Sequence, residues 1–246
     1  MPKPRREIGR RVQLHRALSK LGWGSRKQAW DWICAGEVCV DGRLVTDPLA
    51  WVDLDRQVVA RKGGTLDTPV KVVIALHKPR GVVTTRSDER GRRTVYDLLP
   101  QDFPWIFPAG RLDADSEGLL ILTNDSALAV RLTEPIHHVP KSYRVTLSGS
   151  PSQETLDRLR NGIVMDEEPT RPLRLHVVRR RPDTTVVEMQ LMEGRNRQVR
   201  RMWRSVGHRV RRLVRVAIGA FQLGDLPPGD HRRLSADEQK LLVCVP

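Results

Sequence analysis

The segment 61–69 divides the chain into two parts. It is poor in apolar residues and rich in turn formers, ending in Asp-Thr-Pro. Because such a segment adds little to a hydrophobic core, it predicts a linker at 61–69 between one domain over 10–60 and a second over 70–246. A chain of 246 residues with 39% hydrophobic content is sufficient to build both cores.

The part before the linker predicts two helices followed by a hairpin. Apolar residues recur at near-helical spacing over 12–22, where a glycine can end the first helix. Ser25 and Gln28 form a capping box for a second helix, which Gly36 would end. Strand-like alternation around an Asp-Gly pair then predicts a hairpin over 37–45.

The part after the linker predicts strands with inserted helices. We expect strands at 70–76, 82–85, 119–122, 142–147, 173–178, 184–192 and 209–218, with a turn at 77–81 after the first. We expect helices that begin near Asn124–Asp125, at Ser152 and at a capping box over Ser235–Glu238, and one across 199–206. Strand and helix do not alternate strictly, which favours an α+β domain with a mixed, mainly antiparallel sheet flanked by helices.

The charge of the chain points to a polyanionic partner. Lys and Arg number 43 against 29 Asp and Glu, which gives a net charge of +14 and a pI near 10.7. Nucleic acid is favoured over an anionic membrane surface. No apolar run approaches the roughly 18 residues of a spanning helix, and the first residues lack the apolar centre of a signal peptide. We therefore expect a cytoplasmic protein without a membrane partner.

Cysteine usage fits the same compartment. Cys34, Cys39 and Cys244 match no zinc-binding spacing, and three is an odd number. We expect ordinary buried thiols and no metal.

The run 110–120 gathers three carboxylates, Asp113, Asp115 and Glu117, in an otherwise basic chain. The spacing of these residues fits the first half of a calcium-binding loop. The last ligand position of such a loop needs a bidentate carboxylate, and Asn124 stands there instead. Calcium binding is therefore not expected.

Two interpretations of the run remain. In the first, Asp113 or Ser116 caps backbone amides in a structural turn. In the second, one carboxylate lies at the floor of a basic cleft, where guanidinium groups keep it ionised as a nucleophile or base. Apolar residues on both sides would anchor the loop ends, which favours a fixed carboxylate. The pattern alone leaves the choice between Asp113 and Asp115 open.

The residues from Gly110 to Asp125 resemble the signature of a pseudouridine synthase family, which unites the type A synthases of small-subunit ribosomal RNA with the type B, E and F synthases of large-subunit ribosomal RNA. They match it at every fixed position, and further matches lie at 78–82, 94–100, 141–143 and 193–202. Residues 21–29 and 36–42 resemble the alpha-L RNA-binding domain of the ribosomal protein S-four family. The resemblance implies a small alpha-L domain followed by a pseudouridine synthase catalytic domain.

The resemblance also implies an active site made by Asp113, Tyr143 and Arg200. These enzymes break the bond from uracil N1 to the ribose of a flipped-out uridine, turn the base, and rejoin it through C5. Asp113 would attack C1′ or remove the C2′ proton, and Arg200 would keep it ionised. Tyr143 would stack on the uracil, with its hydroxyl near the C5 proton. No redox change occurs, so no cofactor is expected.

The basic residues near these motifs are expected to hold RNA, because arginine binds phosphate through two hydrogen bonds. Some arginines of the carboxy-terminal cluster could pair with Asp115 or Glu117 instead. The expected RNA-binding residues are Arg26, Lys27, Lys78, Arg80, Arg111, Lys141, Arg195, Arg197 and Arg201.

The implied function is the conversion of uridine to pseudouridine in ribosomal RNA, either free or in a pre-ribosomal particle, by a monomer. Arg197, at a place often held by His, and the segment 224–229 favour the large-subunit type. One alternative is a small-subunit synthase. Another is a non-catalytic RNA-binding protein of ribosome assembly, which would have no reason to carry Asp113, Tyr143 and Arg200 together.

Overall fold

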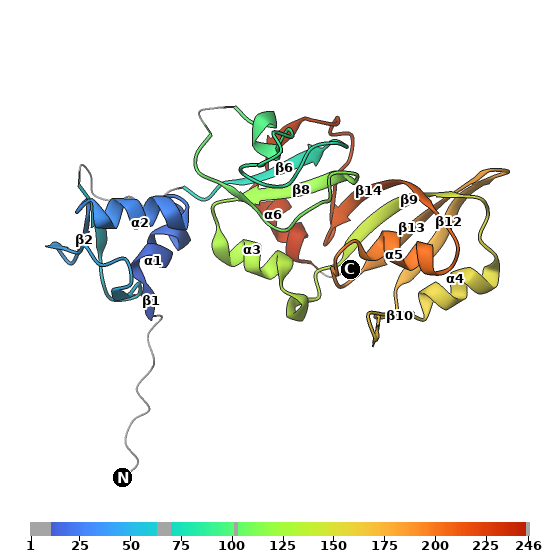
Figure 1. The fold of residues 1–246 in the computed structure, drawn as a ribbon, viewed down its shortest axis with the longest axis horizontal. Coiled ribbons are helices and arrows are strands. Elements are labelled where there is room, and N and C mark those ends of the chain that lie inside the picture. The colour runs from blue at the N-terminus through green and yellow to red at the C-terminus, as the bar shows by residue number, and fades with distance from the viewer. Residues whose placement is uncertain (1–10, 63–69, 101–102, 245–246) are drawn as a thin grey trace, which may run out of the picture. The chain divides into compact units, whose positions relative to one another are not determined.

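The structure, a computed structural model, describes residues 11–62, 70–100 and 103–244. Its residue contacts define two compact units (Figure 1). The first takes in the chain up to Val72 with Pro104–Phe107 and Asn124–Ser126, and the second takes in Val73–Phe103, Pro108–Thr123 and Ala127–Pro246.

The first unit combines two short helices with small antiparallel sheets. Strands β1 and β4 pair with each other, and β3, β2 and β5 form a three-stranded sheet in that order. The elements are β1 (Arg11–Gln13), α1 (Leu14–Lys20), α2 (Arg26–Cys34), β2 (Val38–Val40), β3 (Arg43–Leu44), β4 (Trp51–Asp53) and β5 (Val59–Arg61).

Local signals explain much of this unit. Ser25 accepts a hydrogen bond from the Gln28 amide, and the Gln28 side chain accepts one from the Ser25 amide, which confirms the predicted capping box of α2. Asp41 and Gly42 both have positive φ, as a two-residue hairpin turn requires. The first helix begins at Leu14 rather than at residue 12, because Val12 belongs to β1 and pairs with Val52.

The predicted linker overlaps the first unit at one end. Arg61 is the last residue of β5, where it pairs with Val38 and its guanidinium contacts Glu37. The Lys62 amide donates to the Glu37 carbonyl, so this residue also follows the sheet. Residues 63–69, the rest of the predicted linker, and residue 10, the predicted domain start, lie outside the described residues.

The second unit is built on one large sheet. Its strand order is β12-β13-β9-β14-β8-β6-β16, with β15 on β14 and β7 on β8. The strands are β6 (Val73–Lys78), β7 (Phe107–Pro108), β8 (Glu117–Thr123), β9 (Lys141–Ser148), β12 (Arg174–Arg181), β13 (Thr184–Leu191), β14 (Val210–Ile218), β15 (Phe221–Gln222) and β16 (His231–Arg233). A separate hairpin joins β10 (Val164–Met165) and β11 (Glu168–Pro169). The helices are η1 (Val95–Leu98), α3 (Ser126–Thr133), η2 (Pro135–His137), α4 (Gln153–Arg160), α5 (Gln198–Ser205) and α6 (Ala236–Val243).

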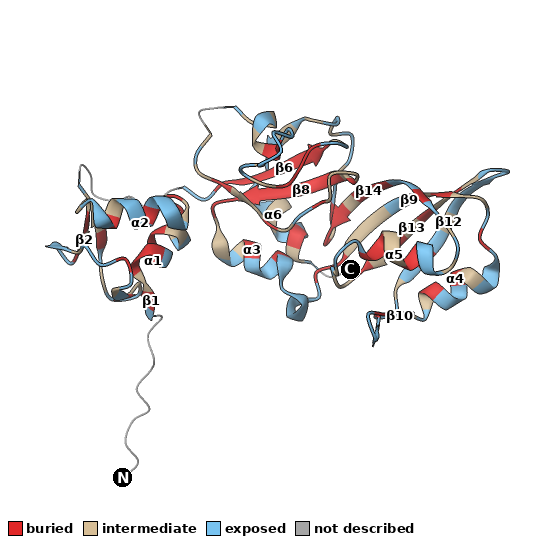
Figure 2. Cartoon of the chain, in the orientation of Figure 1, coloured by how far each residue is buried: buried red, intermediate tan, exposed pale blue. Residues whose placement is uncertain are grey.

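The sheet is mixed but mainly antiparallel, as predicted. The β14–β8 pair is parallel, whereas β12–β13, β13–β9, β9–β14, β8–β6 and β6–β16 are antiparallel. Helices flank this sheet, so the α+β class is confirmed (Figure 1). Strands β6 and β8 are buried almost throughout (Figure 2).

One face of the sheet packs on α4 and α5. Val145 and Leu147 of β9 belong to the same core as Leu156 of α4 and Trp203 of α5, and all four are essentially buried. Their burial fixes β9 and α5 relative to each other. These two elements carry Tyr143 and Arg200.

Two expectations for the start of the second unit need correction. Strand β6 begins at Val73 rather than at residue 70, and it continues through His77 and Lys78, which we expected in a turn. Residues 82–85 form no regular strand; a single bridge joins Val83 to Thr94. Both differences arise because the bounds of a strand depend on pairing with residues far away in the sequence. The β propensity of a segment does not include that pairing.

The described residues contain no helix long and apolar enough to span a membrane. Within the same residues, no group of three His, Cys, Asp or Glu side chains could hold a metal ion. The three cysteines are free, as expected, but the expectation of burial is wrong: Cys34 and Cys244 are exposed and Cys39 is half-buried.

Candidate active site

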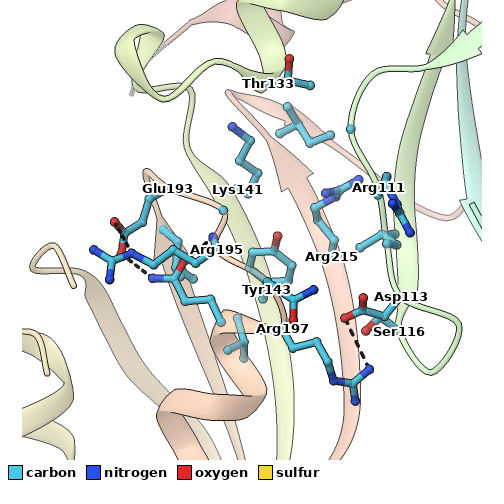
Figure 3. A pocket seen from close by; sticks show the side chains of 18 of the residues that line it. Arg111, Asp113, Ser116, Thr133, Lys141, Tyr143, Glu193, Arg195, Arg197 and Arg215 are labelled. Atoms are coloured by element: carbon cyan, nitrogen blue, oxygen red, sulfur yellow. Dashed lines mark hydrogen bonds and ion pairs between the residues drawn. The ribbon is translucent and has the colours of Figure 1, made fainter. Parts of the chain in front are cut away.

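A pocket of about 450 Å³ opens on the second unit where the loop before β8 meets β9, β14 and the segment between β13 and α5. Asp113 and Arg111 line it from the loop, Tyr143 and Lys141 from β9, and Arg215 from β14. Figure 3 shows these side chains converging from different elements. The pocket therefore brings together residues that lie far apart in the sequence.

Hydrogen bonds to its backbone hold the Asp113 loop in place. Thr84 donates its hydroxyl to the Leu112 carbonyl at 2.8 Å and accepts from the Leu112 amide at 3.3 Å. The Gly81 amide donates to the Ala114 carbonyl at 2.7 Å, and the Ser116 amide donates to the Asp113 carbonyl at 3.0 Å. The loop is thus anchored on both sides of Asp113.

The side chains of Asp113 and Ser116 do not cap this loop. Among the described residues, the Ser116 hydroxyl is buried without a hydrogen-bond partner. The Asp113 carboxylate lines the pocket, 36% of its side chain is exposed, and its ion-pair contact is to the Arg197 guanidinium at 3.8 Å (Figure 3). A fixed carboxylate that faces a cavity fits the catalytic interpretation rather than the structural turn.

The neighbouring carboxylates are held by arginines. Asp115 accepts from Arg197 at 2.6 and 3.2 Å, and Arg200 Nε lies 3.3 Å from its carboxylate. Glu117 pairs with Arg212 at 2.8 Å. The suggestion that Asp115 or Glu117 pairs with arginine is confirmed, and of the three carboxylates Asp113 is the one that lines the pocket.

Arginine contacts decide the charge state of Asp115. Burial acts to raise its pKa, but the hydrogen bond from Arg197 and the charge of Arg200 outweigh burial and leave the pKa below the usual value. Asp115 therefore stays ionised at neutral pH and acts as an anchor for the two arginines.

Arg200 is placed differently from the expectation. It donates to the Asp115 carbonyl at 2.7 Å and to the Val210 carbonyl at 3.3 Å, and its ion pair is with Asp115 rather than with Asp113. The arginine that reaches the Asp113 carboxylate is Arg197, the N-cap residue of α5, whose φ is 48°. The spacing of the motif could not distinguish these two guanidinium groups, because α5 directs both toward one loop.

Tyr143 has a pairing partner on each of the two strands next to β9. It pairs with Met189 of β13 and with Arg215 of β14, and it packs against the core beneath the sheet while lining the pocket. Lys141, two residues earlier, lines the same pocket, as expected for alternate residues of a strand.

A family model described as RNA pseudouridylate synthase matches residues 72–205, which include this pocket loop, Tyr143 and Arg200. The chain belongs to the RNA pseudouridine synthases. It is 43% identical to an uncharacterised RNA pseudouridine synthase of Mycobacterium bovis, over 93% of this chain and 92% of the relative. It is 35% identical to the ribosomal large subunit pseudouridine synthase B of Bacillus subtilis, over 95% and 96%.

The fold agrees with this family. A crystal structure of a pseudouridylate synthase superposes with a TM-score of 0.69 at 28% identity, covering 94% of this chain and 99% of that chain. The protein is therefore an enzyme that acts on RNA, as expected, and the alternative of a non-catalytic RNA-binding protein is set aside.

Lys78 of the synthase cannot bind RNA as expected. Its side chain is fully buried, and its ammonium donates to the carbonyls of Pro79 at 3.0 Å and Val82 at 2.7 Å. Burial lowers its pKa to about 8, against the opposing charges of Asp113, Asp115 and Glu117. It stabilises the turn whose Gly81 amide holds the Asp113 loop.

Two more predicted RNA contacts are engaged within the synthase. Arg195 donates to the carbonyls of Met165, Glu168 and Pro169, and Arg201 pairs with Asp166. Both arginines therefore hold the β10–β11 hairpin. The side chains of Arg26, Lys27, Arg80 and Arg111 are exposed, and Lys141 is half-buried.

Two residues of the synthase pocket region were not predicted from the sequence. Thr84 lies in a segment that we expected to be a strand, and only its contacts with Leu112 reveal its role. Arg215 is 5% exposed and lines the pocket, although it was not among the residues expected at the active site. The signal available in the sequence was the alternation of the strand, which places Arg215 on its buried face, where an arginine is unusual.

Proposed function

We propose that the pocket around Asp113 is the site at which a uridine of large-subunit ribosomal RNA becomes pseudouridine. The observation that carries this proposal is the single pocket in which Asp113 and the aromatic ring of Tyr143 meet. A carboxylate beside the ribose and a ring for the base are the two groups that the isomerisation needs.

Each residue has a stated role in the proposed reaction. Asp113 acts at the ribose as the bond from N1 to C1′ breaks, by capturing C1′ or by removing the C2′ proton. Tyr143 stacks on the extruded uracil and lies near the proton that leaves C5. Arg197 and Arg200 position the Asp113 loop through Asp115 and, for Arg197, through Asp113 itself.

The choice of large-subunit RNA rests on two kinds of support. Arg197 stands at a place often held by His, and together with the segment 224–229 it resembles the large-subunit type. The relatives include the large subunit synthase B of Bacillus subtilis and, at 44% identity over 64% of this chain and 90% of the relative, the large subunit synthase E of Xanthomonas axonopodis.

The first unit is proposed to act as an alpha-L RNA-binding domain, joined to the catalytic domain that starts near residue 70. Arg16 and Lys20 of α1 and Arg26 and Lys27 of α2 are all exposed. This places basic groups on both helices, where phosphates could be bound. The enzyme is proposed to work as a monomer, without cofactor or metal.

Tritium release tests the proposed function. Unmodified ribosomal RNAs of the large and the small subunit, labelled with tritium at C5 of uridine, are incubated separately with the enzyme and with Asp113→Ala. We expect release from large-subunit RNA by the wild type and none by the variant. Release from small-subunit RNA only would refute the choice of the large subunit, and no release from either RNA would refute the proposed function.

A further inference from the structure

Arg215 presents an unsatisfied donor at the pocket. Arg215 belongs to β14 and is almost fully buried, and its Nε donates to the Leu119 carbonyl at 2.7 Å. Among the described residues, its Nη2 is buried without a hydrogen-bond partner. A buried guanidinium donor without an acceptor loses its hydrogen bonds to water and gains none in exchange, which destabilises the free enzyme. The guanidinium lines the pocket with its small exposed part, and within the described residues its one hydrogen bond is to Leu119, so we look to the substrate for a further acceptor.

Lys141 is a second cation with the same property. Its ammonium lines the pocket, and no hydrogen bond or ion pair of it occurs within the part of the chain that the structure describes. Burial and then the charge of Arg215 lower its pKa to about 8. The two cations therefore repel each other. An anion between them would offset this repulsion and the free-energy cost of burying two positive charges.

The sheet places both cations near Tyr143, one on the neighbouring strand and one two residues earlier on the same strand. In the β9–β14 pairing, Tyr143 lies opposite Arg215 and Lys141 lies opposite Ile218. In Figure 3, Arg215 lies between Lys141 and Tyr143 on one side and Arg111 and Asp113 on the other. A base stacked on Tyr143 would thus have its edge within the field of both cations.

A close backbone approach fixes Arg215. Gly118 has a φ of +107°, and a Cβ added to it would overlap the Arg215 carbonyl oxygen and lie 2.6 Å from the Arg215 nitrogen. Only glycine allows β8 and β14 to come so near. The Arg215 backbone is therefore fixed by its close contact with Gly118, and its guanidinium is fixed by the Leu119 carbonyl.

No carboxylate of the pocket region is available to neutralise the pair among the residues described. Asp115 is engaged by Arg197 and Arg200, and Glu117 by Arg212. Glu193, which also lines the pocket, pairs with Arg195 and accepts a hydrogen bond from Gln198. Asp113 is reserved for the ribose in the proposed reaction. The acceptor for Arg215 and Lys141 must therefore come from the RNA.

We propose that Arg215 and Lys141 are catalytic residues that bind the carbonyl oxygens of the flipped-out uracil and stabilise the negative charge that the base acquires when its bond to the ribose breaks. The inference rests on the proposed function of the pocket. Asp113 acts at the ribose and Tyr143 stacks on the base, so neither of them neutralises the negative charge on the base, which is the role of Arg215 and Lys141.

The charge balance of the step requires such a group. When the N1–C1′ bond breaks, its electron pair remains on the base, and uracil becomes an anion delocalised over N1, O2 and O4. The positive charge on the ribose is met by Asp113. The anion then attacks C1′ through C5, either displacing Asp113 from C1′ or adding as C2′ regains its proton. One proton leaves C5 and one is gained at N1, so the step is an isomerisation and no oxidant or reductant enters. Donors that contact the base oxygens are most effective when the charge is present, as in an oxyanion hole.

A backbone phosphate is the other anion that RNA offers. The pocket walls next to the cations are partly apolar, with Leu112, Leu132, Leu213 and Ile218. Burial of a phosphate against such walls is less favourable than burial of a flat base. Loss of a phosphate contact would weaken RNA binding, whereas loss of an anion-stabilising contact would slow bond cleavage at saturating enzyme.

The test compares uridine RNA with 5-fluorouridine RNA. Fluorine at C5 withdraws electrons and makes uracil a better leaving anion, so it should reduce the need for the two cations. The variants are Arg215→Lys, which removes the forked donors but keeps a charge, and Lys141→Met. Arg158→Lys and Lys240→Met, exposed on α4 and α6, serve as matched controls. Single-turnover loss of the starting nucleoside is followed by chromatography after nuclease digestion, alongside RNA affinity.

We expect each pocket variant to slow uridine RNA by roughly 100-fold and 5-fluorouridine RNA by less than about tenfold, with unchanged RNA affinity. The controls should match the wild type on both RNAs. Equal losses on both RNAs, weakened binding with an unchanged saturating rate, or no loss at all would each overturn the inference. An inactive wild type on uridine RNA would instead refute the proposed function, so the two failures are distinguishable.

Discussion

At the scale of single residues, charge alone does not determine a role in this enzyme. Lys78, Arg195 and Arg201 are cations in family motifs, but the structure uses them to hold turns and a hairpin. Arg215 lies in a row of arginines, but it is buried at the pocket. Burial and hydrogen-bond partners decide what each cation does, and neither can be determined from composition.

Lys141 carries a pH prediction at this scale. Burial, reinforced by Arg215, lowers its pKa to about 8, so the ammonium form that the reaction needs is lost as pH rises through about 8. We expect the single-turnover rate to fall about tenfold per pH unit above that point. Lys141→Arg should keep its charge and remain active at higher pH.

The pH profile of single-turnover tritium release checks this prediction. The charged groups that line the pocket around Lys141 are Arg215 of β14, Arg111 and Asp113 of the loop before β8, and Glu193, Arg195 and Arg197 before α5. An alkaline decline that is identical in the wild type and in Lys141→Arg would assign the titration to Lys78, whose pKa is also about 8, to one of these groups or to the RNA, and would contradict the prediction.

At the scale of elements, the site depends on how closely β8 and β14 approach. The parallel pairing of Gly118 with Arg215 brings the Asp113 loop beside the strand that carries the buried guanidinium. Gly118 is thus a fixed position of the motif for a steric reason. The short turn that contains Lys78 and Gly81 then holds the other side of the loop.

Gly118→Ala should therefore be strongly destabilising. A left-handed φ in a non-glycine residue costs about 1 kcal/mol, and overlap with the Arg215 backbone should add about 1 to 3 kcal/mol. Gly149→Ala is the matched control, because Gly149 has a φ of +74° but nothing within 4 Å of an added Cβ. The free energy of unfolding in urea measures both losses. Equal losses in the two variants would show that the close approach is not required.

At the scale of the whole molecule, the first unit should supply RNA affinity and the second unit the chemistry. We expect Arg26→Ala combined with Lys27→Ala to weaken RNA binding and to reduce the slope of log affinity against log salt by about 1 to 2. The saturating single-turnover rate should be unchanged. The control removes two other exposed cations of the same unit, Arg43 and Arg56.

Filter binding at several salt concentrations measures this effect. Equal weakening by both pairs would mean that charge in general, rather than the surface of α2, holds the RNA. A lower saturating rate would place the α2 cations in the catalytic step and contradict the division of labour.

The sequence predicted the parts of the fold that local chemistry specifies. The capping boxes at Ser25 and Ser235 and the Asp41–Gly42 hairpin are formed as expected, because each needs only neighbours in the chain. Strands β4 and β5 were missed, and residues 82–85 were assigned wrongly, because pairing partners lie far away in the sequence. The motif identified the Asp113 loop, but the contacts of Arg197 and Arg200 depend on how α5 packs.

We propose that Asp113, and neither of its acidic neighbours, acts at the ribose. Single-turnover tritium release by Asp113→Asn, Asp115→Asn and Glu117→Gln, at saturating enzyme on the same RNA, distinguishes the three carboxylates. We predict that Asp113→Asn lowers the rate by more than roughly 10,000-fold. Asp115→Asn should lose about 10- to 100-fold, because Arg197 and Arg200 lose their anchor, and Glu117→Gln should lose less than about tenfold. Substantial activity in Asp113→Asn, or a loss in Asp115→Asn as complete as in Asp113→Asn, would contradict the assignment.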